Sequence, residues 1–212
     1  MTDTRTKLLA ATTESLRHDG IAGLSARGVA ARAGVNQALV FYHFGSVGEL
    51  VQAAVRTSVD ASVGSYRARF DEIGSLAELL TVGRELHERE RALGNVAVMA
   101  QLMAGAQQDL TLAEAARYAM ARWNDQIEDV VRRVLGDNPL GDLVDPGRLA
   151  QAISAVFIGL ELYDGVDPVG SSAAIEALET LVAMLQVAAE LGPVSSRALR
   201  AKLRQVSARA AG

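Results

Sequence analysis

The sequence predicts an all-α protein with an N-terminal head of three helices, a long connecting helix and a larger helical domain. Apolar residues recur at helical spacing in nearly every segment, and no run shows the two-residue alternation of a β-strand. The prolines lie between these segments, where they interrupt no helix: Pro139, Pro146, Pro168 and Pro193. A chain of 212 residues, 50% of them hydrophobic, is long enough to bury a substantial core.

The composition narrows the classes of protein and of site. The chain has no cysteine, which excludes disulfides, thiolate metal sites and cysteine nucleophiles. No apolar run approaches the roughly 18 uncharged residues of a membrane span. The N-terminus carries charges on both sides of a short apolar patch, unlike a signal peptide. We therefore expect a cytoplasmic protein with no membrane partner.

The charge is unevenly distributed along the chain. The formal net charge is −4, but residues 1–56 carry +2 and the remainder carries −6. A mildly basic front on an acidic body is typical of a small nucleic-acid-binding head on a larger domain.

The head is expected to contain three helices. The first runs from about Thr4 to His18 and has these inward positions: Leu8, Leu9, Thr12 and Leu16. Ser25 can cap a short second helix that ends at Gly34, and Asn36 can cap a third that ends near Phe44.

Capping signals also mark the later helices. The S-x-x-E signature opens a long fourth helix at Ser46 and Glu49, and it recurs before the fifth and seventh helices, at Ser75/Glu78 and Thr111/Glu114. Gly94-Asn95 separates the fifth helix from the sixth, and Asp145-Pro146 opens the eighth. With a ninth helix and a basic tail helix over residues 195–210, we expect about ten helices.

Two short helices that meet at a tight glycine turn after a longer helix form the outline of a helix-turn-helix. Gly34 stands where a positive φ is most easily adopted by glycine. The third helix contains a dense aromatic block, and we expect its inward face to be Val40, Phe41 and Phe44. Tyr42 and His43 should lie on the other side and meet DNA phosphates.

The stretch "GLSARGVAARAGVNQALVFYHFGSVGEL" resembles the N-terminal helix-turn-helix of the TetR family of transcriptional repressors. The resemblance covers roughly residues 5–55 and is carried by Ser25, Arg27, Val29 and Ala30, by Ala33 to Val35, by Phe41 to Phe44, and by Ser46, Glu49 and Leu50. One position departs from the family pattern. Val47 stands where the family usually has a lysine that meets a DNA phosphate.

The resemblance implies roles for residues of the head. Gln37 and Ala38 would contact base edges, since Gln can pair with adenine and Ala can touch a thymine methyl group. Phosphates would be held by Ser25, Arg27, Tyr42 and His43, and an N-terminal arm would contain Arg5 and Lys7. The alternative is a helix-turn-helix that serves only as a packing element.

The resemblance also implies a DNA-binding domain over residues 1–48 and an effector-binding and dimerisation domain over residues 49–212. The candidate ligand-binding residues are Met99, Met103, Met120, Trp123, Phe157, Gln101, Gln107, Tyr118, Glu161 and His87. For each methionine or aromatic residue, ordinary core packing is the alternative. The candidate dimer interface contains Ile153, Val156, Leu160, Leu178, Leu181 and Leu185, for which internal packing is the alternative.

We therefore expect a homodimeric, ligand-responsive transcriptional regulator, most simply a repressor that a small molecule releases from a two-fold symmetric DNA operator. The alternative is an all-helical dimeric regulator that acts by ligand capture or protein partners and binds DNA weakly. Neither an enzyme nor a metal or cofactor site is expected. The sequence has no G-x-S-x-G, P-loop or G-x-G-x-x-G motif, and "HERER" at His87 lacks the second histidine of a zinc motif.

Overall fold

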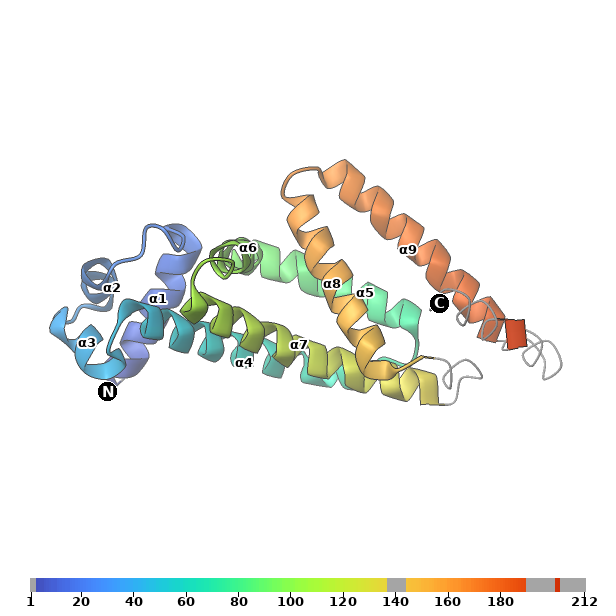
Figure 1. The fold of residues 1–212 in the computed structure, drawn as a ribbon, viewed down its shortest axis with the longest axis horizontal. Coiled ribbons are helices and arrows are strands. Elements are labelled where there is room, and N and C mark those ends of the chain that lie inside the picture. Colours follow the sequence, from blue (N-terminus) through green and yellow to red (C-terminus); the bar gives the residue numbers. More distant parts are fainter. Residues whose placement is uncertain (1–2, 137–143, 190–200, 203–212) are drawn as a thin grey trace. The chain divides into compact units, whose positions relative to one another are not determined.

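The computed structural model describes residues 3–136, 144–189 and 201–202, apart from the side chains at 185, 188 and 189. Every element within these ranges is an α-helix, so the all-α class is confirmed (Figure 1). In chain order the helices are α1 (Thr4–His18), α2 (Ala26–Ala33), α3 (Ala38–Phe44), α4 (Val47–Asp71), α5 (Leu76–Ala92), α6 (Asn95–Gly105), α7 (Leu110–Gly136), α8 (Pro146–Asp164) and α9 (Pro168–Ala189). Of the tail helix expected at 195–210, only residues 201–202 are described, and these two are helical; the rest lies outside the described residues.

Most helix ends follow the capping signals in the sequence. The Ser25 hydroxyl accepts a hydrogen bond from the Gly28 N–H at 3.1 Å, and Gly34 ends α2 with a φ of 66°. At the start of α4, the Ser46 hydroxyl accepts from the Glu49 N–H at 3.1 Å. Each of these bonds satisfies a backbone group that a helix end would leave without a partner.

One predicted cap is wrong. Thr111 was expected to cap α7, but α7 begins one residue earlier, at Leu110. The Asp109 carboxylate accepts hydrogen bonds from the Thr111 N–H at 2.8 Å and from the Leu112 N–H at 3.2 Å. Aspartate and threonine both accept bonds from the first turn of a helix, and here the aspartate stands two residues closer to the end of α6.

The chain forms two compact units. The first contains Met1–Arg67 and Glu85–Trp123, and the second contains Ala68–Arg84 and Asn124–Gly212. The predicted boundary between residues 48 and 49 stays a prediction.

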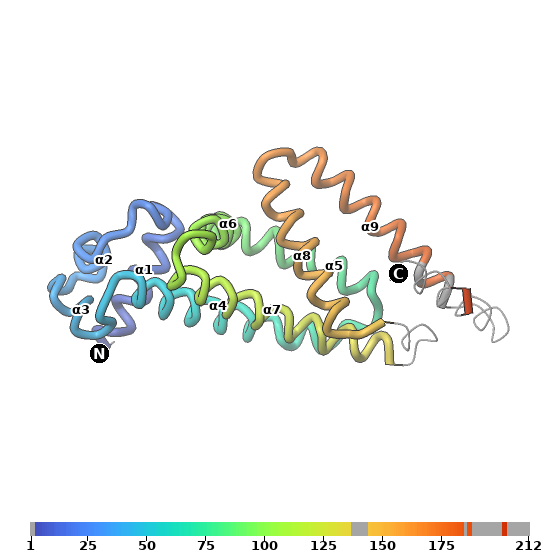
Figure 2. The backbone as a smooth tube through the Cα atoms, viewed as in Figure 1, coloured from blue at the N-terminus to red at the C-terminus, as the bar shows by residue number. Residues whose placement is uncertain are grey.

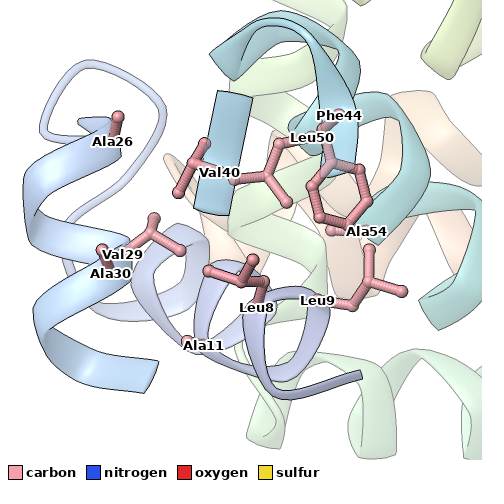
Figure 3. Packing of buried hydrophobic residues seen from close by; sticks show 10 residues of the cluster. All are labelled: Leu8, Leu9, Ala11, Ala26, Val29, Ala30, Val40, Phe44, Leu50 and Ala54. Atoms are coloured by element: carbon pink, nitrogen blue, oxygen red, sulfur yellow. The ribbon is translucent and has the colours of Figure 1, made fainter. Parts of the chain in front are cut away.

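A first hydrophobic core lies in the first unit and holds α1, α2, α3 and the start of α4 together. Its buried residues are Leu8, Leu9, Ala11, Ala26, Val29, Ala30, Val40, Phe44, Leu50 and Ala54. In Figure 3, Leu8 and Leu9 point from α1 toward Val40, Leu50 and Phe44. α3 has only seven residues, so its stability depends on this packing.

A second core in the same unit joins α1 and α4 to α6 and α7. It contains Leu16, Val51, Val55, Leu102, Ala115, Ala116 and Ala119. Two polar contacts also connect α6 to the head. The Gln101 side-chain oxygen accepts from the Ile21 N–H at 2.8 Å, and the Asn95 side-chain oxygen accepts from Arg17 Nε at 2.9 Å.

The second unit contains the end of α4, the first part of α5, the second part of α7, and helices α8 and α9. The Arg133 guanidinium on α7 donates to the carbonyls of Phe70 at 2.7 Å and Ile73 at 3.1 Å, and so caps the C-terminal end of α4. α8 and α9 lie side by side and run in opposite directions (Figure 2).

Within the described ranges, no single helix is both long enough and apolar enough to cross a membrane. The pair α3 and α4 reaches the required length and composition only when both helices are taken together, across a bend of 66°.

Candidate nucleic-acid interface and effector residues

The candidate recognition helix is α3, which stands on the first core. Val40 is fully buried and Phe44 nearly so, and these two residues are one helical turn apart on the same face. Gly45 follows with a φ of 79° and turns the chain into α4. A left-handed backbone of this kind favours glycine, so the turn that fixes the angle between α3 and α4 is encoded locally.

The opposite face of α3 presents Ala38, Phe41 and Tyr42, which are spaced i, i+3 and i+4. Tyr42 is 81% exposed and Phe41 is 47% exposed. The expectation that Phe41 points inward is therefore wrong. Successive residues turn by 100° around a helix, so a helix anchored through Val40 and Phe44 carries Phe41 to the edge of its exposed face.

The residues expected to read base edges are at the start of this face. Gln37 and Ala38 are both exposed. The side-chain carbonyl oxygen of Asn36 accepts a hydrogen bond from the Ala38 N–H at 2.8 Å, so Asn36 closes the turn before α3. Gln37 makes no side-chain capping bond. Its amide therefore keeps donors and an acceptor for a partner.

The residues expected to meet phosphates surround α3. Arg27 is exposed on α2, and Ser25 is exposed but already caps that helix. His43 is half-buried and meets the Tyr42 ring edge-on, with 5.1 Å between ring centroids. This contact limits how the imidazole can turn.

The expected N-terminal arm is not present at Arg5 and Lys7, because both residues belong to the first turns of α1. The Arg5 guanidinium lies over the Phe44 ring, 5.3 Å from its centroid. Lys7 is exposed. α1 therefore holds the Arg5 cation beside the C-terminal end of α3, where it can still meet a phosphate.

Val47 is half-buried in the first turn of α4 and packs against both hydrophobic cores. The apolar side chain at this position is thus used in packing. A lysine here would have to extend its ammonium group out of the contact while leaving its stem in place.

The candidate effector residues divide between the two units. Phe157 and Glu161 belong to the second unit, and all the others belong to the first. Several of those in the first unit are engaged within the protein. Met99 packs against the second core, Gln101 binds the Ile21 N–H, and the Tyr118 hydroxyl donates to Asp60.

Tyr118 and Asp60 form part of a charged cluster that joins α7 to α4. Asp60 accepts from Arg122 Nε at 2.8 Å and from the Tyr118 hydroxyl at 2.8 and 2.9 Å, while the Arg56 guanidinium lies 4.5 Å from the centre of the Tyr118 ring. The hydrogen bonds from Arg122 and Tyr118 lower the pKa of Asp60. The bond to Asp60 raises the pKa of the Tyr118 hydroxyl.

Sequence reasoning missed Tyr66 on α4. This residue is 7% exposed, and its ring lies 6.1 Å from the ring of Trp123 on α7. The Arg89 guanidinium lies over the Tyr66 ring, 5.1 Å from its centroid. Helical spacing places Tyr66 on the same face of α4 as the buried Val63 and Phe70, which is why the sequence suggested only ordinary core packing there.

In the second unit, Phe157 on α8 packs over Gly83, where an added Cβ would stand 3.4 Å from the ring. Val156 and Leu181, both expected at a dimer interface, are 45% and 56% exposed. Ile153, Leu160 and Leu178 are half-buried, and the side chain of Leu185 lies outside the described part. α8 and α9 therefore expose apolar side chains.

Residues 8–54 match the family model described as "Bacterial regulatory proteins, tetR family". An HTH-type transcriptional regulator of Mycobacterium tuberculosis (strain H37Rv) is 26% identical over 170 residues, which cover 78% of this chain and 85% of the relative.

Solved structures show the same fold. A TetR-family transcriptional regulator from Rhodococcus sp. has a TM-score of 0.69 at 23% identity, over 87% of this chain and 98% of that one. The multidrug binding protein EbrR complexed with imidazole has a TM-score of 0.64 at 26% identity, over 86% of this chain and 96% of that one. EbrR has also been solved with proflavin.

The helix-turn-helix and the helices that follow it in the sequence define the class of the protein. It is a DNA-binding transcription regulator. Within that class, the helix-turn-helix at residues 8–54 is that of the tetR family of bacterial regulatory proteins.

Proposed function

We propose that this protein binds a two-fold symmetric DNA operator as a homodimer and represses transcription until a small-molecule effector lowers its affinity for DNA. In this proposal residues 1–48 form the DNA-binding domain, and residues 49–212 bind the effector and the second subunit. The protein acts in the cytoplasm and catalyses no reaction.

The observation that carries the DNA-binding part is the division of α3 into two faces. Val40 and Phe44 anchor the helix, while Ala38, Phe41 and Tyr42 face solvent beside the exposed Gln37. Large exposed aromatic residues on a short, firmly anchored helix suit insertion into a major groove, where Ala and Phe can contact thymine methyl groups.

The homodimer is supported by the apolar side chains that α8 and α9 expose, among them Val156, Leu181 and Met184. Two antiparallel helices of this kind can pair with their copies about a two-fold axis to form a four-helix bundle. A symmetric dimer presents one recognition helix to each half-site, so the operator should be an inverted repeat with half-sites about one helical turn apart.

The effector is supported by similarity to EbrR, a multidrug binding protein whose structures contain imidazole or proflavin. An effector acts only through its preference for one conformation, and the coupling between two such sites is typically about 1–3 kcal/mol.

Selection from random duplex DNA with the purified protein tests this proposal. We expect enrichment of an inverted repeat, together with a footprint that has two-fold symmetry. Enrichment of a single half-site, or of no sequence, would contradict a dimeric operator-binding regulator and favour a regulator that acts through ligand or protein partners.

A further inference from the structure

A buried hydroxyl group lies beside the pair of aromatic rings in the first unit. The Tyr66 hydroxyl is shielded from solvent, and no group in the described ranges meets it at full hydrogen-bond distance and angle. The Arg89 guanidinium approaches closely enough to oppose the rise in its pKa. Buried tyrosine hydroxyls normally have a partner, because leaving one without it is unfavourable. The neighbouring Trp123 ring is half-buried and tilted by 59° relative to the Tyr66 ring. A ligand that contacts the rings could therefore also complete the hydrogen bonding of Tyr66.

The charges around Tyr66 favour a cation. The Arg89 guanidinium, a planar delocalised cation, already lies over the Tyr66 ring. The pKa of Tyr66 is raised chiefly by burial, and the negative charges of Glu90 and Glu85 raise it further, against the opposing effect of Arg89. The negative charges of Glu85 and Glu90, both on α5, therefore lie close enough to affect the Tyr66 hydroxyl.

Glu90 is half-buried, and the hydrogen bonds that hold it come from neutral groups. Its Oε1 atom accepts from the Ser62 hydroxyl at 2.8 Å, and its Oε2 atom accepts from Asn95 Nδ2 at 2.6 Å. These partners orient the carboxylate but do not neutralise its charge. A positively charged ligand near Tyr66 would gain from that charge.

We propose that a planar organic cation binds beside Tyr66 and Trp123, takes the place of Arg89 over the Tyr66 ring and pairs with the Glu90 carboxylate. This proposal rests on the proposed function and names the chemical class of the effector.

The same carboxylate connects this site to the DNA-binding head. Asn95, which donates to Glu90, accepts from Arg17 on α1, and the Arg17 side chain lies against Gly94, where an added Cβ would be 3.6 Å from Arg17 Cβ and Cγ. A cation that draws Glu90 toward itself weakens its bond to Asn95. Asn95 then holds Arg17 less firmly, which is how the bound cation would affect α1.

Trp123 is the only tryptophan in the chain, so its fluorescence reports on the proposed site. We would titrate DNA-free protein with proflavin and, as a neutral planar control, with acridine at a pH where its ring nitrogen is unprotonated. We expect saturable quenching by proflavin and binding of acridine at least about tenfold weaker. Absence of saturable quenching, or equal affinity for the two compounds, would overturn the site.

Matched variants locate the charge. Glu90→Gln keeps the size of the side chain and should weaken proflavin binding about tenfold, whereas Glu88→Gln, at an exposed position on the same helix, should leave it unchanged. Tyr66→Phe, which removes only the hydroxyl, should weaken proflavin binding severalfold and serves if the Glu90 variant fails to fold. Equal affinities for all three folded variants and the original protein would contradict the proposal.

Hydrogen exchange on DNA-free protein tests the connection to α1 and avoids intercalation of proflavin into DNA. Proflavin should accelerate amide exchange in the last turn of α1. Asn95→Ala should show fast exchange there from the start and no further change with proflavin, while still binding the compound. If Asn95→Ala responds like the original protein, the connection is refuted.

Operator binding without any cation is measured separately. If the protein binds its operator but not proflavin, the cation site is wrong and the proposed regulator stands; if it binds proflavin but no DNA, the proposed function fails instead.

Discussion

Phe41 and Val40 are adjacent in the sequence yet contribute to α3 in different ways, because one turns toward solvent and the other toward the core. We expect Phe41→Ala to reduce the preference for operator over random DNA by about 1–3 kcal/mol, since it removes an apolar contact to base edges.

Lys7→Ala should weaken binding to operator and random DNA equally and lower the salt dependence of binding by about one counterion. Titration of each variant with both duplexes at several salt concentrations checks this. An equal loss on both duplexes for Phe41→Ala would place its ring on the backbone.

Val47 has a packing role that opposes its replacement by lysine. We expect Val47→Lys to lower the free energy of unfolding by about 1 kcal/mol, because the side chain loses part of its contact with two hydrophobic cores. The alternative, from the family pattern, is that lysine adds a phosphate contact and steepens the salt dependence of DNA binding. Urea unfolding and salt titrations on the same variant distinguish the two. A steeper salt dependence with unchanged stability would show that the lysine reaches DNA.

Tyr66 offers a test of buried hydroxyl energetics. Because its hydroxyl is buried and meets no described group at full hydrogen-bond geometry, Tyr66→Phe should raise the free energy of unfolding by about 1 kcal/mol in the absence of ligand. The ring and its contact with Trp123 are unchanged in this variant. Urea unfolding followed by circular dichroism measures the difference. A loss of stability would show that the hydroxyl has a favourable interaction in solution.

Single residues that satisfy backbone groups were predictable from the sequence. Ser25, Gly34 and Ser46 end or begin helices as expected, because a cap depends on residues within one turn of it. Phe41 was not predictable in the same way. Three aromatic residues in a short helix leave open which two face inward, and that choice depends on where α1 and α4 stand.

At the scale of helices, Asp60 joins α4 to α7. Its pKa is lowered by Arg122 and Tyr118, so the deprotonated form is favoured in the folded protein. Its contribution to stability is therefore fully present above about pH 5 and disappears as the pH falls through the lowered pKa. Asp60→Asn should lower the melting temperature at pH 7, and the two melting temperatures should converge as the pH falls below about 4.

The Tyr118 hydroxyl should lose its contribution to stability at high pH, whereas Asp60 loses its contribution at low pH. Its pKa is raised by Asp60, so the protonated form is favoured in the folded protein and this contribution is lost only as the pH rises through the raised value. Tyr118→Phe should therefore lower the melting temperature at pH 7 less than Asp60→Asn does, because it leaves the bond from Arg122 to Asp60 in place. A difference between Asp60→Asn and the original protein that does not shrink as the pH falls below about 4 would mean that the carboxylate charge is not what joins the helices.

The helix boundaries were largely predictable, whereas the partners of the helices were not. Gly94, Asp145 and Pro146 mark helix ends in any context. The engagement of Gln101 with Ile21 and of Tyr118 with Asp60 joins residues more than 50 positions apart, and nothing in the local pattern indicates such pairs. Both glutamine and tyrosine were plausible ligand contacts for that reason.

For the whole molecule, dimerisation through α8 and α9 predicts that one charge can separate the subunits. Val156→Glu or Leu181→Glu should yield a monomer, because each places a carboxylate at an exposed apolar position of the proposed interface. DNA affinity should fall as well, since a monomer contacts a single half-site. Gln151→Glu, at another exposed position on α8, is the control. Light scattering and gel shift on the same samples check both effects, and a dimeric Val156→Glu protein would place the interface elsewhere.

The two cores in the first unit limit where this protein can be cut and joined to a relative. α1 supplies Leu8 to one core and Leu16 to the other, and α4 supplies Leu50 and Val51 in the same way. A chimera joined at residue 48 would take most of the first core but only Leu16 of the second from one parent, and the remaining core residues from the other. The side chains of both cores would then no longer be matched in volume. Recombination should therefore succeed more often at junctions that carry α1 and the start of α4 across together. The same constraint favours regulators in which the DNA-binding head and the rest of the chain change in sequence together. It disfavours recombination that replaces the head alone.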